Sequence, residues 1–146
     1  MISIRKANSN DIDSLMEIEN TCFINPWSKE DLIREISENI YANFLLAEID
    51  GVIAGFIDCW FTFESGTICQ IGVLPNFRRN HIASTLMEKI IELAKFGDVY
   101  SLTLEVRASN VNAIGLYKKF QFEQRVIKPH YYENGEDAIY MVRSVY

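Results

Sequence analysis

The chain has few cysteines and no excess of basic residues, and each shortage argues against a class of protein. The chain has three cysteines, Cys22, Cys59 and Cys69. Their odd number and the lack of C-x-x-C spacing argue against a disulfide framework and against a zinc site. We therefore expect reduced thiols in the core and no bound metal. A net charge of -6 disfavours broad nucleic-acid binding, which needs a basic surface, and it would suit a cationic substrate.

Long apolar runs are also missing. The N-terminus MISIRKANSN has no such run behind its charges, and the longest apolar stretches are far too short to span a bilayer. We expect neither a signal peptide nor a membrane helix, and predict a cytoplasmic protein without a membrane partner. No linker or low-complexity tract interrupts the 146 residues, of which 49% are apolar, so residues 1–146 are predicted to form a single domain with a real core.

Hydrophobic periodicity predicts strands and helices in a definite order. The first strand spans residues 2–6, and Ser9 is placed to cap a helix that ends near Phe23. Ser28, followed three residues later by Asp31, is typical of a capping box that opens a second helix. Two helices therefore follow the first strand.

The rest of the chain continues this alternation. Asp50-Gly51 is a strong two-residue hairpin signal, and residues 64–66 are expected to turn the chain again. The remaining predicted elements are strands at 44–49, 52–61 and 68–74, a helix at 82–96 ended by Gly97, a strand at 100–106, a helix at 111–120, and strands at 122–127 and 138–142. Phe44, Phe56, Trp60, Phe61 and Phe63 are expected in the core or on the sheet. The order βααβββαβαββ predicts a mixed α/β fold.

Residues 101–122, SLTLEVRASNVNAIGLYKKFQF, are the most informative stretch. They place Glu105 near the end of an apolar run with strand character and Tyr117 on the helical stretch that follows. A carboxylate and a phenol so carried can flank one cleft as a proton acceptor and a proton donor, which suggests group transfer.

Residues 73–86, VLPNFRRNHIASTL, are a second candidate site. A strand that enters a helix through such a loop presents unpaired N–H groups and the positive end of the helix dipole, which together suit a pyrophosphate. Taken alone, the loop could equally be an ordinary joint with two solvated arginines, Arg78 and Arg79.

Both stretches resemble the GNAT N-acetyltransferase superfamily, and within it the ribosomal-protein-alanine N-acetyltransferases. Residues 101–122 match the signature LEVR-x-SN-x-x-A-x-x-LY-x-x-x-GF, and residues 78–83 correspond to the Q/R-x-x-G-x-G/A loop for acetyl-CoA. The resemblance implies a GNAT-like fold, a central mixed sheet flanked by helices, and an acetyl-CoA-dependent N-acetyltransferase. It also implies that Glu105 accepts the ammonium proton of the substrate, directly or through water, and that Tyr117 protonates the departing CoA thiolate.

The cofactor residues are likewise implied by the resemblance. The main chain of Ile71, Gly72 and Val73 would line the acyl and pantetheine arm, and Asn110 would contact the cofactor from the other side. The residues that would hold the pyrophosphate are Arg79, Asn80, His81, Ile82, Ala83 and Ser84.

Two residues depart from the family pattern. His81 stands where the family has a glycine that lets the backbone approach phosphate, so its imidazole must point away or contact the cofactor itself. Gln121 stands where the family usually has glycine after the helix of Tyr117. A non-glycine residue in a left-handed cap costs roughly 1 kcal/mol, which a domain tolerates, so we expect no loss of activity.

Two further matches suggest where the acceptor binds. Residues 22–28, which include Pro26 and Trp27, resemble the C/A-F-x-x-PWS segment of the ribosomal-protein-alanine enzymes, and Tyr131 and Tyr132 resemble their tyrosine pair. Such loops would wall a peptide groove. Trp27 fits a hydrophobic staple on the second helix as well as it fits direct substrate contact. Neighbours on an extended chain point opposite ways, so at least one of the two tyrosines is expected to face the cleft.

Acidity favours a protein N-terminus as the acceptor. An α-amino group with a pKa near 7.8 is neutral for roughly a quarter of the time near pH 7.4, whereas a lysine near 10.4 is neutral for about one part in a thousand. The resemblance narrows the acceptor to the N-terminal alanine of a small-subunit ribosomal protein, acetylated by a monomer or weak dimer of this chain. Two alternatives stay open: an acetyltransferase for a small amine or for lysine, and a CoA-binding regulatory module without turnover.

Overall fold

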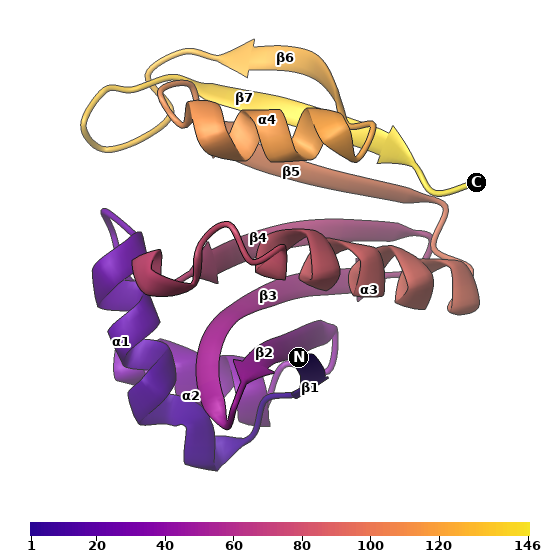
Figure 1. The fold of residues 1–146 in the computed structure, drawn as a ribbon. Helices are drawn as coiled ribbons and strands as arrows, with labels where there is room; N and C mark the ends of the chain where they lie inside the picture. Colours follow the sequence, from indigo (N-terminus) through magenta and orange to yellow (C-terminus); the bar gives the residue numbers. More distant parts are fainter.

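The computed structural model describes all residues from 1 to 146. Its elements are β1 (Ile2–Lys6), η1 (Ser9–Asp11), α1 (Ile12–Cys22), α2 (Lys29–Ser37), β2 (Ala42–Ile49), β3 (Val52–Thr62), β4 (Ser65–Val73), η2 (Pro75–Phe77), α3 (Ile82–Phe96), β5 (Ser101–Arg107), α4 (Val111–Lys119), β6 (Glu123–Lys128) and β7 (Ala138–Ser144). The elements η1 and η2 are short turns of 3-10 helix. Apart from these two turns, the order is the predicted βααβββαβαββ, so the mixed α/β prediction is confirmed (Figure 1).

All seven strands belong to one sheet, in the order β1-β2-β3-β4-β5-β7-β6. Neighbouring strands are antiparallel except for β4 and β5, which are parallel. These two strands pair only along Ser65 to Ile68 and Ser101 to Leu104. Beyond this stretch they diverge, and Figure 1 shows them drawn apart at one end. The second half of β4 therefore keeps one edge whose backbone groups the sheet does not use.

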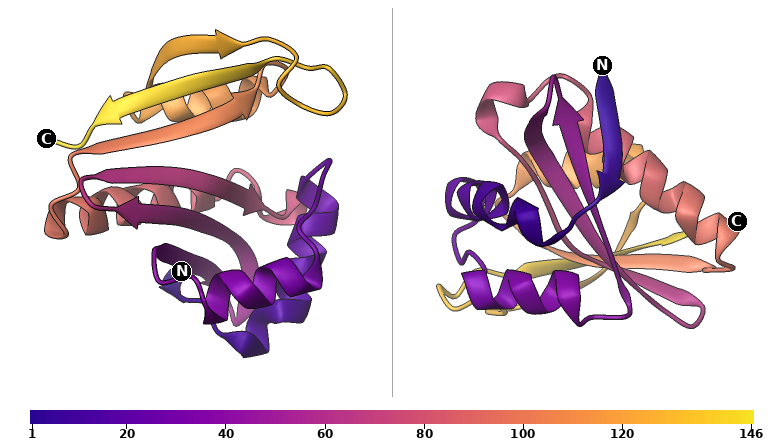
Figure 2. Two further views of the ribbon diagram at one scale, coloured as in Figure 1. Left: turned by 180° about the vertical axis from the view of Figure 1, so that it is seen from behind. Right: turned by 90° about the horizontal axis from the view of Figure 1, so that it is seen from below.

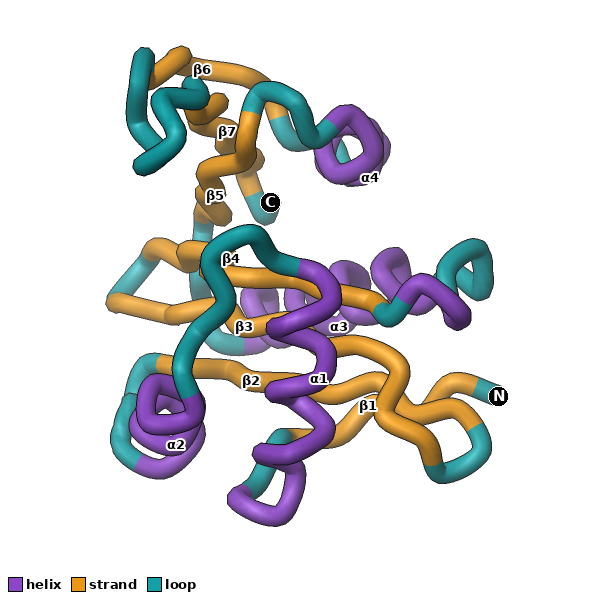
Figure 3. The backbone as a smooth tube through the Cα atoms, turned by 90° about the vertical axis from the view of Figure 1, so that its left-hand side faces the viewer, coloured by secondary structure: helices purple, strands orange, loops and turns teal.

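Helices cover both faces of the sheet, and the two cores differ in size. The helices α3 and α4 pack on one face over 20 buried residues, among them Leu86 and Leu104. On the other face α1 and α2 pack over a cluster of seven, among them Leu15 and Phe56. Figure 3 shows α2 on one side of the strands with α3 and α4 on the other, and Figure 2 shows the twist of the sheet. None of these helices combines the length and the apolar character that crossing a bilayer requires.

Local capping decides where the first two helices begin. The residue that caps the first helical turn is Asn8, and the prediction of Ser9 is wrong by one position, because Asn8 forms a reciprocal capping box with Asp11. The predicted box at Ser28 and Asp31 is confirmed, since each backbone N–H donates to the other side chain, at 3.2 and 3.1 Å.

The two hairpin turns show a confirmed prediction and a corrected one. Asp50 and Gly51 have φ values of 51° and 78°, and a type I′ turn needs both to be positive. The next turn is tighter than predicted, because β4 already begins at Ser65 and only Phe63 and Glu64 connect it to β3. Phe63 is 97% exposed, so its expected place in the core or on the sheet is wrong: a turn side chain at positive φ points to solvent.

Candidate active site

A pocket of about 510 Å³ lies where β4 and β5 diverge. The second half of β4, the loop after it, the first turn of α3 and the start of α4 border it. The predicted cofactor residues in its lining are Ile71, Gly72, Val73, Arg79, His81, Ile82, Ala83, Ser84 and Asn110. Asn80 is the predicted residue outside this lining, and its side-chain amide donates to the carbonyl of Phe77 at 3.0 Å. The fold therefore brings three segments that are distant in sequence around one pocket.

The first turn of α3 is the part of the pocket that suits an anion. The N–H groups of Ile82, Ala83 and Ser84 have no hydrogen-bond acceptor within the chain, and no side chain caps the helix. A helix N-terminus also carries partial positive charge, so the three amides can bind phosphate oxygens. Arg79 adds a full positive charge at the exposed rim.

The loop before α3 reaches this geometry through left-handed backbone. Arg79 has a φ of 68° and His81 a φ of 60°, values that glycine adopts at little cost. His81 is the N-cap of α3, its side chain makes no capping bond, and the residue is exposed. The family's glycine position thus has a left-handed backbone in this chain although it carries an imidazole.

The second half of β4 borders the pocket with main chain. After Ile68 this strand pairs with β3 alone, so one edge is free for a ligand that carries amide groups, such as the pantetheine arm of CoA. Gly72 allows close packing on the other side, because a Cβ there would lie 3.2 Å from the ring of Phe23. The Cys22 thiol donates to the carbonyl of Val73 at 3.4 Å, and burial raises the pKa of this thiol. Free amides, a cationic rim and a free strand edge together fit acetyl-CoA.

Tyr117 lies on α4 beside this region and belongs to the larger core. It is 6% exposed and its ring meets Phe122 edge-on, with centroids 5.9 Å apart. Burial raises the pKa of Tyr117 far above its ordinary value, so the phenol keeps its proton at neutral pH. Asn110 begins α4 and accepts a hydrogen bond from the N–H of Ala113 at 3.2 Å. Gln121, just after the helix, has a φ of 69°, which confirms the predicted left-handed cap.

Glu105 points to the opposite face of β5. Its neighbours Leu104 and Val106 are buried in the larger core, and strand alternation directs Glu105 away from that core. The hydroxyl of Tyr131 donates to Glu105 Oε1 at 3.2 Å, and Nζ of Lys128 lies 2.7 Å from Oε2. Glu105 and Tyr117 therefore lie on opposite sides of the sheet, and one reaction can use both only through the opening between β4 and β5.

The loop between β6 and β7 carries both predicted tyrosines. The rings of Tyr131 and Tyr132 meet edge to face with centroids 5.1 Å apart, so the expectation that they point opposite ways is wrong. Alternation holds for an extended strand, whereas this segment turns, with His130 at a φ of 52°. Tyr131 is 50% exposed and reaches Glu105, while Tyr132 is more buried.

Arg107 holds this loop in place. Its guanidinium lies 4.0 Å from the ring centre of Tyr132 and 3.3 Å from Glu136 Oε1. The second oxygen of Glu136 accepts from the N–H of Ser109 at 2.7 Å. A cation over an aromatic ring and a partly buried ion pair thereby join β5, the turn before α4 and the tyrosine loop.

The loop between α1 and α2 is held by a buried carboxyl group. Glu19 is fully buried, and its Oε1 accepts from the N–H of Trp27 at 2.8 Å and from the Gln70 amide at 3.2 Å. Burial raises the pKa of Glu19. Trp27 packs against the smaller core, as a staple would, and also borders an open pocket, while Pro26 is exposed. Both interpretations of Trp27 therefore remain compatible with its position.

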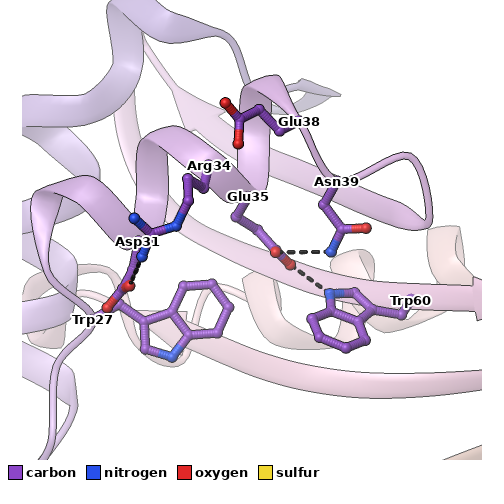
Figure 4. Close-up of a pocket in the computed structure, with 7 residues that line it drawn as sticks. All are labelled: Trp27, Asp31, Arg34, Glu35, Glu38, Asn39 and Trp60. Carbon is purple, nitrogen blue, oxygen red and sulfur yellow. Dashed lines mark hydrogen bonds and ion pairs between the residues drawn. The ribbon is translucent and has the colours of Figure 1, made fainter.

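That open pocket, of about 520 Å³, lies between α2 and β3 (Figure 4). It is lined by Trp27, Asp31, Arg34, Glu35, Glu38, Asn39 and Trp60. Glu35 accepts from the indole N–H of Trp60 and from the Asn39 amide at 2.9 Å. The lining of this open pocket therefore consists largely of carboxyl and amide side chains, whereas the first pocket offers free backbone amides.

Asp58 on β3 lies behind Glu35 and is fully buried. Burial and the nearby Glu35 carboxylate raise the pKa of Asp58 to about 10. The oxygens of Asp58 have no hydrogen-bond partner in the protein, and with this raised pKa Asp58 keeps its proton at neutral pH. Burial acts to raise the pKa of Glu35, but the neighbouring Asp58 and the hydrogen bonds from Asn39 and Trp60 lower it.

Sequence reasoning missed Lys128, Glu136 and the buried carboxyl groups. The partners of these residues are distant along the chain: Lys128 meets Glu105 from β6, and Glu136 meets Arg107 from the tyrosine loop. Arg107 itself was visible in the LEVR motif, but no local signal indicated which groups it would contact.

Comparisons with known proteins indicate acetyl transfer. Residues 12–122 match the acetyltransferase (GNAT) family. The chain is 40% identical over 140 residues to the Bacillus subtilis protein named "Putative [ribosomal protein bS18]-alanine N-acetyltransferase", covering 95% of this chain and 93% of that one. It is 32% identical over 148 residues to the [ribosomal protein bS18]-alanine N-acetyltransferase of Escherichia coli, covering 99% of each.

A solved structure shows the same likeness in three dimensions. The ribosomal-protein-S18-alanine N-acetyltransferase from Escherichia coli superposes with a TM-score of 0.91 at 28% sequence identity, covering 99% of this chain and 94% of that one. The family match spans both diverging strands, α3 and α4, and the pocket between them fits acetyl-CoA, the acetyl donor of this family. This chain therefore belongs to the acetyltransferase (GNAT) family.

Proposed function

We propose that this protein transfers the acetyl group of acetyl-CoA to the N-terminal α-amine of a protein, and that the acceptor is the N-terminal alanine of ribosomal protein bS18. The observation that carries the proposal is a carboxylate, Glu105, where β5 leaves β4, together with a buried phenol, Tyr117, on the helix α4 that borders the pocket. The names of the Bacillus subtilis and Escherichia coli relatives support this acceptor.

In this proposal the pocket beside β4 holds acetyl-CoA. The amides of Ile82, Ala83 and Ser84, with Arg79 and the main chain of Asn80 and His81 in the preceding loop, bind the pyrophosphate, and the main chain of residues 71–73 binds the pantetheine arm. Asn110 adds a contact from the start of α4. Acetyl-CoA, when bound, supplies the acetyl group as a reactive thioester.

The chain's own residues then move two protons. Glu105 takes one from the α-ammonium, directly or through water, which leaves the nitrogen with a free electron pair. The nitrogen forms a bond to the acetyl carbon while the carbon–sulfur bond breaks, and Tyr117 gives its proton to the sulfur. The nitrogen loses its second proton to water as the amide forms. Because burial keeps Tyr117 protonated, the donor is ready at neutral pH, and it regains its proton from solvent afterwards.

The acceptor chain lies between two loops in this proposal. Tyr131 and Tyr132 form one wall beside Glu105, and Pro26 and Trp27 form the other. An α-amine suits a single carboxylate base better than lysine does, since roughly a quarter of it is already neutral near pH 7.4. We further propose that residues 1–146 act as one domain in the cytoplasm, as a monomer or weak dimer that binds neither nucleic acid nor membrane.

A peptide panel tests this function. The protein is incubated with acetyl-CoA and peptides that differ only in their first two residues, together with an N-terminally blocked peptide that contains lysine and a small free amine. Mass spectrometry is expected to show acetylation of the alanine N-terminus and much less of the others. Preferred acetylation of the blocked peptide or the small amine would support the other acceptor classes instead. CoA binding by calorimetry without any turnover would support a regulatory module.

A further inference from the structure

Lys128 faces the carboxylate that serves as the base in the proposed mechanism. It is the last residue of β6, and its Nζ lies 2.7 Å from Glu105 Oε2. The same ammonium lies 5.3 Å from the ring centres of both Tyr131 and Tyr140. Groups from β5, β7 and the tyrosine loop thus surround one cation, although its side chain stays 41% exposed.

The charges around Glu105 nearly cancel. The titratable groups that face Lys128 are Glu105 on β5, Tyr131 on the loop and Tyr140 on β7, and Glu105 is the one carboxylate among them. Arg107 and Glu136, farther along, pair with each other at 3.3 Å and add no net charge. A substrate amine that approaches Glu105 therefore meets one carboxylate that is already neutralised by one ammonium.

We propose that Lys128 lowers the pH at which the bound α-ammonium gives up its proton beside Glu105; this inference rests on the proposed function. A lone carboxylate would stabilise an ammonium beside it and oppose the loss of its proton. Lys128 removes this bias, because a second cation at the same carboxylate is repelled by the first. The bound amine then loses its proton at a lower pH and becomes nucleophilic. Lys128 acts through Glu105 and is a positioning residue.

The variant Lys128→Met removes the charge and keeps most of the side-chain length. If this raises the midpoint at which the bound amine titrates by about one pH unit from near 7.8, its neutral fraction at pH 7.4 falls from roughly a quarter to about 4%. We expect kcat at saturating peptide to fall about sevenfold at pH 7.4 but less than about twofold at pH 9.5. Lys128→Arg keeps the charge and should stay within about twofold of the natural protein at both values.

The matched control is Lys89→Met on α3. Lys89 also has an ion-pair partner, Glu92 at 3.5 Å, and a side chain that is 40% exposed, but it lies outside the candidate site. This variant should keep the natural pH profile. Lys128→Gln is a second neutral variant, and thermal unfolding of each variant checks that it folds.

A second readout does not depend on turnover. A peptide labelled with ¹⁵N at its α-amine is titrated by NMR on the protein with CoA, and its midpoint should lie about one pH unit higher on Lys128→Met. A loss of kcat that is equal at both pH values, or a Lys128→Arg variant as impaired as Lys128→Met, overturns the inference and leaves the proposed function intact. A peptide that the natural protein neither binds nor acetylates overturns the proposed function and the inference together.

Discussion

The two faces of the sheet are built in different ways. On the α3/α4 face the larger core contains no buried carboxyl group, and its pocket offers free backbone amides. The opposite face has the chain's four buried carboxyl residues, Asp11, Glu19, Glu35 and Asp58, and Glu105 with its ion-pair partner also points to this side. The proposed cofactor side thus relies on main-chain groups, whereas the proposed acceptor side depends on individual side chains.

This difference explains which departures from the family pattern the chain can tolerate. His81 and Gln121 both stand at family glycine positions in left-handed backbone. The amides after His81 remain free whatever its side chain is, so the backbone of the proposed phosphate site is kept. A change at Glu105 or Tyr131 would instead remove a group with no backbone substitute.

The largest effect is expected for the proposed acid and base. Glu105→Gln and Tyr117→Phe should each lower kcat by about 100-fold to 10,000-fold, the usual contribution of a general acid or base. The dissociation constant for acetyl-CoA, measured by calorimetry, should change less than about threefold, which also controls for misfolding. Losses below about fivefold in both variants would remove these residues from the mechanism.

Asp58→Asn should make stability less sensitive to pH. The pKa of Asp58 is raised from 3.8 to about 10, so the folded protein keeps a proton that the unfolded chain releases above about pH 4. The stabilisation from this proton is complete below about pH 4 and is lost as the pH rises toward 10. Asparagine does not ionise, so its advantage over aspartate should grow by about 1.4 kcal/mol for each pH unit above about pH 4, or by about 4 kcal/mol from pH 5 to pH 8.

Urea unfolding at several pH values measures this effect. The difference in the free energy of unfolding between Asp58→Asn and the natural protein should grow steadily with pH. The exposed Asp50→Asn variant at the first hairpin serves as a control without such a trend. A difference that does not vary with pH would show that Asp58 holds no extra proton.

A smaller effect is expected for Tyr131→Phe, which removes one hydrogen bond to Glu105. One such bond to a charged group contributes on the order of 1 kcal/mol, so the Michaelis constant for the peptide should rise about fivefold. The Michaelis constant for acetyl-CoA should stay nearly unchanged, because Tyr131 does not line the cofactor pocket. Equal increases for both substrates would argue for a structural role of the tyrosine.

The smallest effect on function is expected for His81→Gly. Glycine adopts the φ of 60° freely, so the variant should gain about 1 kcal/mol of stability or less. Its affinity for CoA should stay within about threefold of the natural protein, because the amides of α3 remain in place. An affinity that falls tenfold or more, as measured by calorimetry, would mean that the imidazole contacts the cofactor and that the contrast between the two faces is less sharp.

Much of the architecture could be read from the sequence because its signals are local. The capping box at Ser28 and Asp31, the hairpin at Asp50-Gly51 and the helix that ends before Gly97 all depend on a few neighbouring residues. The candidate positions Glu105 and Tyr117 were found in the same way, from one continuous motif. The errors at Ser9 and at residues 64–66 are shifts of one or two residues, where adjacent residues compete for the same cap or turn.

Local sequence signals thus predict the order of the elements, the family motifs and the candidate site positions. The contacts between Lys128 and Glu105 and between the two tyrosine rings, and the burial of Asp58 beside Glu35, come from the three-dimensional arrangement alone. The physical reason is that periodicity, capping and turn formation act over a few residues. Ion pairs and pKa shifts depend instead on which distant side chains the sheet brings within a few ångströms, and on how far it removes them from water.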